Sequence, residues 1–140
     1  MGIELVPLAK VTATGRGLIP IGVGPAGDRM IGEVSGFEMS GERLNAHLKG
    51  VAAADWALVA PDGTASVDVR LAVETDDGAL IYITYQGRFD LSVGWDKAVI
   101  YVAPRFETSD NRYKWLNPLQ AVGKGWFAEP GVHYDWYELR

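Results

Sequence analysis

Hydrophobic and polar residues alternate with a period of two along most of this chain, which is the pattern of a β-strand with one face in a core. In residues 66–74, valine and leucine fill the odd positions, whereas the even positions include Asp68, Arg70 and Glu74. Looser alternation predicts further strands over residues 3–14, 29–39, 43–49, 97–105 and 132–139. A total of roughly eight to ten strands suits an all-β fold, a single closed or nearly closed antiparallel β-barrel.

Two segments interrupt the alternation. Glycines and prolines crowd residues 15–27, which predicts a loop or a bulged edge there. One short helix at most is expected, near residues 110–116, because Ser109 or Asp110 is a suitable N-cap and Pro118 follows. With 140 residues, 48% of them hydrophobic, the chain is expected to form one domain over residues 1–140.

Two Asp-Gly pairs predict tight hairpins in the middle of the chain. Asp62-Gly63 and Asp77-Gly78 each separate alternating segments, and glycine supplies the positive φ that primed hairpin turns require. If the first loop has two residues, counting back along both strands places Asp55 opposite Arg70. The second loop has two residues or three, and the sequence leaves both registers open.

The predicted register brings three charged side chains onto one face, namely Asp55, Asp68 and Arg70. If this face lines the lumen, Arg70 bridges both carboxylates, and the less compensated one has a raised pKa and acts as a general acid or base. We therefore treat these three as candidate catalytic residues. The alternative is an ion-pair cluster that only fixes the strand register.

Aromatic and polar residues near this face and in the predicted strand-end loop are candidates for ligand contacts. Small-molecule pockets combine an apolar lining with a few orienting polar groups, and loops at a barrel mouth are natural places for them. The second hairpin register decides whether Tyr82 or Tyr85 shares the face of Arg70. The candidate ligand-binding residues are Trp56, Tyr82, Tyr85, Arg105, Glu107, Trp115 and Asn117.

Charge and composition restrict the classes of partner that this chain is expected to bind. The net charge is -5, and the 13 basic residues are dispersed, so we expect no nucleic-acid partner. The chain has no cysteine and only two histidines, His47 and His133, so neither a metal site nor a cofactor is expected. No segment has the roughly 20 consecutive apolar residues of a membrane span, and the first ten lack the features of a secretory signal. We expect a soluble, cytoplasmic protein.

Several segments together resemble the DUF3237 family, also called UPF0311, over nearly the whole chain. They are Ala54-Asp55-Trp56, Val67-Asp68-Val69-Arg70, Thr75-Asp76-Asp77-Gly78, Phe106-Glu107-Thr108 and Arg112-Tyr113-Lys114-Trp115-Leu116-Asn117. The resemblance implies a single-domain β-barrel and no particular activity. Where the family pattern commonly has an aromatic-Arg-Thr run, this chain has Tyr101-Val102-Ala103, so any family site that uses that arginine is in doubt here.

Two functional hypotheses follow. In the first, a small barrel encloses a hydrophobic or aromatic molecule and catalyses a cofactor-independent isomerase, lyase or hydratase reaction with a carboxylate. In the second, the chain is a noncatalytic ligand-binding or oligomerisation module with a structural charge cluster. The sequence does not decide between a monomer and a homo-oligomer.

Overall fold

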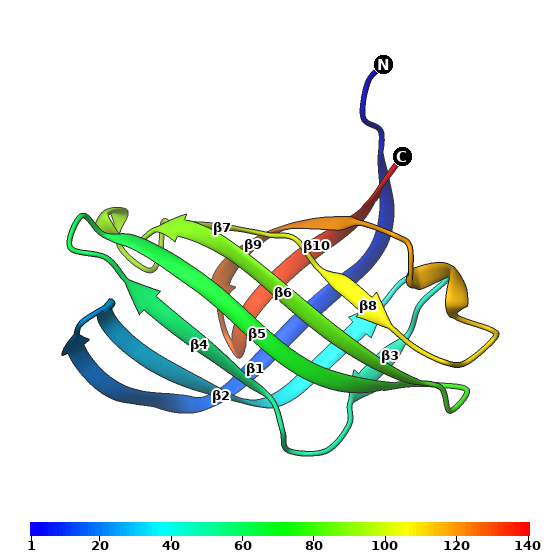
Figure 1. Ribbon diagram of the computed structural model, residues 1–140, viewed down its shortest axis with the longest axis horizontal. Helices are drawn as coiled ribbons and strands as arrows, with labels where there is room; N and C mark the ends of the chain where they lie inside the picture. The colour runs from blue at the N-terminus through cyan, green and yellow to red at the C-terminus, as the bar shows by residue number, and fades with distance from the viewer.

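The computed structural model describes residues 1–140 as an antiparallel sheet of ten strands. Eight strands close into a ring in the order β5-β4-β2-β1-β10-β9-β7-β6, with β6 pairing back to β5 (Figure 1). The all-β barrel prediction is confirmed. The strands are β1 (Leu5–Gly24), β2 (Gly27–Ser40), β3 (Ala46–Leu48), β4 (Ala54–Val59), β5 (Thr64–Thr75), β6 (Leu80–Asp90), β7 (Val99–Val102), β8 (Arg105–Glu107), β9 (Ala121–Ala128) and β10 (Gly131–Leu139).

Two short strands extend the ring where longer ones stop. β3 pairs with β2 and β5 beyond the end of β4, and β8 pairs with β6 beyond the end of β7. Two single turns of 3-10 helix lie at opposite ends of the barrel: η1 (Leu91–Val93) and η2 (Lys114–Leu116) (Figure 1). No helix is long and apolar enough to span a bilayer.

The core fills the η2 end of the barrel. Its side chains come from the inward positions of the strands, and aromatic rings pack around Trp136, which is 1% exposed. Phe37, Tyr85 and Phe106 contact that indole with ring centroids 6.0, 5.3 and 6.1 Å away. Glycines on β9 make room for rings on β10, since a Cβ at Gly123 would lie 2.5 Å from the Trp136 ring.

Both Asp-Gly turns are three-residue loops, which corrects the predicted register of the first one. The Ala60 amide donates to the Thr64 carbonyl oxygen (2.9 Å), and the Gly63 amide donates to the Ala60 carbonyl oxygen (2.9 Å). Proline favours the first central position of a type I turn, and glycine the following left-handed position, so Pro61-Asp62-Gly63 fits this longer loop. Gly63 has a φ of +89°. Asp55 therefore lies opposite Val69 rather than Arg70.

The structure also decides two further expectations. Of the loop or bulged edge expected after residue 14, it shows the bulged edge: residues 15–24 continue β1 and pair with β2 only, with register shifts around Gly15 and Gly22. The predicted helix is a turn closed by Asp110, whose carboxylate accepts from the Arg112 amide (2.9 Å), followed by η2. The strand β9 had no prediction of its own, because glycines alternate with its larger residues.

Candidate functional site

A cavity of about 330 Å³ opens at the η1 end of the barrel. It lies inside the ring, above the aromatic core, and residues from the β1–β2 hairpin and the β9–β10 turn form its rim. Of its 24 lining residues, 16 are hydrophobic. This volume lies at the lower end of the range for small-molecule pockets.

Asp55 places a carboxyl group on the inner wall of this cavity. The three-residue turn places it on the same face as Val69, which is 2% exposed, and beside Gly32 of β2. One carboxylate oxygen, Oδ1, accepts the Asp68 backbone amide at 2.9 Å. Burial raises the pKa of Asp55 from 3.8 to about 6; the Asp68 amide opposes this shift, and the Asp68 charge adds to it. A carboxyl with such a pKa exchanges protons near neutral pH.

Two tyrosines lie at the base of the cavity near Asp55. Tyr85 is the β6 neighbour of Val69, and Tyr134 belongs to β10. Their rings meet edge to face, with centroids 5.8 Å apart. Burial raises the pKa of both hydroxyls, and the charge of Asp55 raises both further. Both tyrosines are therefore neutral hydrogen-bond donors at any physiological pH.

Three aromatic rings form one side of the cavity. Phe89, Trp95 and Phe127 pack against each other with centroids 5.0 to 6.1 Å apart. Trp95 follows η1 and is 46% exposed, so part of this residue is open to solvent. These rings provide an apolar surface on which a flat ligand can pack.

The predicted catalytic trio is not assembled. Asp68 and Arg70 lie on the outer face of β5, whose inner face carries the buried Val69. Asp55 does not join them, because the β4–β5 register differs by one residue from the expected one and this shift turns Asp55 to the inner face. The Arg70 guanidinium stacks on the Trp56 ring, 4.4 Å from its centroid, so Trp56 also belongs to the outer wall. Asp68 accepts a long hydrogen bond from Gln86 (3.4 Å).

Three predicted ligand residues lie on this outer wall as well. Tyr82 of β6 pairs with Glu107 of β8. Thr84 of β6 lies between Arg105 of β8 and Arg70 of β5, so these residues form a row across the three strands. The three-residue second turn decides this arrangement, because it assigns Tyr82 to the outside and Tyr85 to the lumen. Of the predicted site residues, Asp55 and Tyr85 line the cavity, whereas Tyr82, Arg105 and Glu107 do not.

The family model DUF3237, described as a protein of unknown function, matches residues 3–139. The chain belongs to the DUF3237 family. The crystal structure of a β-barrel-like protein from Acinetobacter baumannii is similar to this chain, with a TM-score of 0.89 and 33% identity, covering 100% of this chain and 98% of that one. A UPF0311 protein of Rhodopseudomonas palustris is 34% identical over 109 residues, which cover 69% of this chain and 71% of that protein.

A shorter match connects this DUF3237 chain with an enzyme. A protein of Penicillium herquei named as a hydroalkoxylation enzyme is 37% identical over 62 residues. These residues represent 44% of this chain and 35% of that protein.

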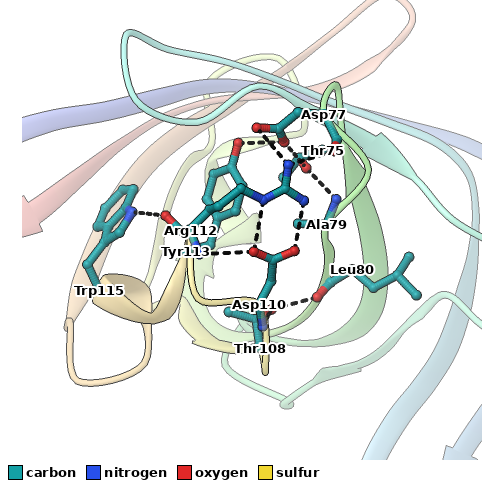
Figure 2. A network of polar contacts seen from close by, with 9 residues as sticks. All are labelled: Thr75, Asp77, Ala79, Leu80, Thr108, Asp110, Arg112, Tyr113 and Trp115. Atoms are coloured by element: carbon teal, nitrogen blue, oxygen red, sulfur yellow. Dashed lines mark hydrogen bonds and ion pairs between the residues drawn. The ribbon is translucent and has the colours of Figure 1, made fainter.

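The remaining two predicted ligand residues, Trp115 and Asn117, lie at the η2 end, away from the cavity. Trp115 donates from its indole nitrogen to the Arg112 carbonyl oxygen (3.2 Å), as Figure 2 shows. Asn117 holds the Thr108 backbone with two hydrogen bonds, at 2.9 and 3.0 Å. Both side chains thus stabilise the connection between β8 and β9, and neither lines the cavity inside the barrel.

A polar network fastens the second Asp-Gly turn to this connection (Figure 2). Asp77 accepts hydrogen bonds from Thr75 (2.6 Å) and from the Tyr113 hydroxyl (2.8 Å). The Arg112 guanidinium donates one hydrogen bond to the Asp77 carbonyl oxygen (2.9 Å) and two to the Asp110 carboxylate (3.0 and 2.8 Å). The hydrogen bonds from Arg112 lower the pKa of Asp110 to about 2. This network closes the barrel end opposite the cavity.

Thr75 is the buried member of the network, at 1% exposure, and we expect Thr75→Val to destabilise the protein by about 2 kcal/mol. Valine has a similar shape but leaves the Ala79 amide, now bonded to Thr75 Oγ1 at 2.8 Å, without its partner. Denaturant unfolding measures the loss. Thr84→Val is the matched control, because Thr84 is half-buried on the outer wall. Equal losses in both variants would contradict the role of the network.

Tyr134, Phe89 and Phe127 line the cavity but were not predicted as ligand contacts from the sequence. Asp55 and Tyr85 lie in one hairpin meander, where local turns fix the neighbours. Tyr134 reaches them only because β10 pairs with β1 and β9, a closure between segments far apart in the chain. One signal was present: Val132, Tyr134 and Trp136 alternate with polar residues, which indicates that they share the inner face.

Proposed function

We propose that this chain binds a small, mainly apolar molecule in the open end of the barrel and that Asp55 moves a proton on it. The reaction class is a cofactor-independent isomerisation, addition or elimination. The observation that carries the proposal is the carboxyl of Asp55, with a pKa of about 6, on the wall of a largely hydrophobic cavity. Perturbed carboxyls in clefts are candidates for catalytic acids and bases.

The geometry supports a base that can also return its proton. Oδ1 is engaged by the Asp68 amide at 2.9 Å, which fixes the orientation of the carboxyl and leaves Oδ2 for a ligand. A group with a pKa near 6 is mostly ionised at neutral pH, and its conjugate acid is still a competent donor. The apolar surroundings strengthen its interactions because they exclude water.

The partial similarity to the hydroalkoxylation enzyme of Penicillium herquei is compatible with this reaction class. Hydroalkoxylation adds an O–H bond across a carbon–carbon double bond, so one proton leaves oxygen and one is added to carbon. No electrons are exchanged with another reactant. A single carboxyl that accepts and returns a proton supplies the chemistry that such an addition needs.

A neutral, flat probe with an activated C–H bond tests the proposal, and nitrobenzisoxazole is suitable. A carboxylate removes its ring C–H proton, the C–H electron pair forms a nitrile, and the N–O bond breaks to give a coloured phenolate. We expect turnover by the wild type to rise with pH through about 6, as the Asp55 carboxylate forms, and then to level off. Asp55→Asn should reduce the rate by about a hundredfold or more.

Arg70→Met is the matched control for this experiment, because Arg70 lies on the outer wall of the same hairpin. Its rate should stay within about twofold of the wild type. An Asp55→Asn variant as active as the wild type would refute the proposed role of Asp55. If the wild type binds the probe without converting it, the noncatalytic ligand-binding module is the better description.

A further inference from the structure

Two polar groups in the cavity have no partner within the protein. Tyr85 and Tyr134 are 3% and 4% exposed, yet neither hydroxyl takes part in a side-chain hydrogen bond. The indole nitrogen of Trp136 is the one fully enclosed polar side-chain atom without a partner. The two tyrosine hydroxyls are therefore open to the cavity that both residues line. Two accessible donors on a largely apolar wall are the kind of polar group that orients an oxygen-bearing ligand.

The charges of the lining restrict what that ligand can be. The 24 residues around the cavity include two acids, Asp55 and Glu33, and no lysine, arginine or histidine. A carboxylate or phosphate on the ligand would be desolvated next to Asp55 without a compensating cation, which is costly. A neutral molecule has no such desolvation penalty. The 16 hydrophobic residues of the lining can pack against the apolar part of such a molecule, for example a ring system.

We propose that Tyr85 and Tyr134 together donate hydrogen bonds to one carbonyl or phenolic oxygen of a neutral, ring-containing substrate. This inference rests on the proposed function and assigns its substrate class. Asp55 takes a proton from the carbon next to the carbonyl group, and the C–H electron pair moves toward the carbonyl oxygen. The two hydroxyls stabilise the enolate formed there. In a substrate with a carbon–carbon double bond conjugated to the enolate, the protonated Asp55 then returns the proton to the far end of that conjugated system. The double bond moves, the carbonyl group re-forms, and no oxidant or reductant is required.

Three naphthalene compounds separate the contributions to binding: naphthol, naphthalene and naphthoate. We expect naphthol to bind at least about tenfold more tightly than naphthalene, because only naphthol offers an oxygen to the tyrosines. Naphthoate has the same ring system and an anionic group, and its binding should be the weakest of the three at about pH 8, where Asp55 is ionised. Isothermal calorimetry or ligand-observed NMR measures the three affinities.

Tyr85→Phe and Tyr134→Phe test the donors. Each should weaken naphthol binding by about tenfold and leave naphthalene binding within about twofold. Neither variant should lower the melting temperature, because no hydrogen bond within the protein is lost. A melting temperature that falls in both variants, or equal losses for naphthol and naphthalene, would overturn the assignment and give the tyrosines a packing role.

The outcomes separate the two proposals. If naphthol binds through the tyrosines but nitrobenzisoxazole is not converted, the donor pair stands and the catalytic role of Asp55 fails. If nitrobenzisoxazole is converted but naphthol and naphthalene bind equally, Asp55 stands and the donor pair fails. Tighter binding of naphthoate than of naphthol also overturns the assignment of a neutral substrate. If none of the three compounds binds and nitrobenzisoxazole is not converted, both proposals are overturned.

Discussion

Asp55→Asn should stabilise the folded protein at about pH 8 by about 2 to 3 kcal/mol. The pKa of Asp55 is about 6 in the folded state, against an ordinary value of 3.8. At a pH between these two values, the carboxyl is therefore protonated in the folded state and ionised in the unfolded state. Wild-type stability therefore falls as pH rises from about 4 to about 6, and the full cost persists above that range. Asparagine carries no charge at any pH and keeps an oxygen for the Asp68 amide.

Urea unfolding at about pH 8 and about pH 4 measures this effect, because the advantage of asparagine should largely vanish at the lower pH. Asp68→Asn is the matched control: Asp68 is half-buried on the outer wall, and its variant should differ by less than about 0.5 kcal/mol. If Asp55→Asn instead destabilises the protein at the higher pH, the ionised carboxylate is a structural partner and the acid–base proposal loses its physical basis.

A destabilising carboxyl is informative about function. Replacing a group that serves only stability lowers stability, whereas functional sites often carry strained or desolvated groups whose removal raises it. Asp77 and Asp110 at the η2 end show the opposite situation, because hydrogen bonds lower the pKa of both. The two ends of the barrel thus shift carboxyl pKa values in opposite directions. At the η2 end, hydrogen-bond donors stabilise the ionised carboxylates, whereas at the cavity end burial of Asp55 disfavours ionisation.

The sequence predicted the barrel well because its signals are local. The alternation in β5 fixes which side chains share a face, and the two Asp-Gly pairs fix where the chain turns. The register depended on a single loop residue. Pro61 extends the first loop to three residues, and this difference moves Asp55 into the lumen while Arg70 stays outside. The three predicted catalytic residues are therefore neighbours in one hairpin, but Asp55 lies on a different face from Asp68 and Arg70.

The cavity itself could not be predicted in the same way. Its wall combines β4 and β6 with β10, and no pattern within one hairpin shows that Tyr134 will lie beside Tyr85. The space also depends on small residues such as Gly32 and Ala57, whose lack of bulk becomes visible only once the ring closes. Empty volume is a property of the assembled barrel, whereas alternation is a property of each strand.

Ala57→Phe should abolish ligand binding without unfolding the protein, and this is the most direct test of the cavity. Ala57 lies two residues from Asp55 on the same face of β4, opposite Met30. A phenyl ring at this position enters a cavity of about 330 Å³, so it occupies space that a ligand needs and displaces no core side chain. We expect naphthol affinity to fall by about tenfold or more, with an unfolding free energy within about 1.5 kcal/mol of the wild type.

Ala72→Phe provides the matched control, because Ala72 lies on the outer face of β5 opposite Tyr82. The added ring has the same size but stays outside the barrel, so naphthol affinity should remain within about twofold of the wild type. Equal losses in both variants would mean that the ligand binds elsewhere or that both substitutions disturb the sheet. A loss confined to Ala57→Phe places the ligand beside Asp55, because only that ring competes for the space its carboxyl faces.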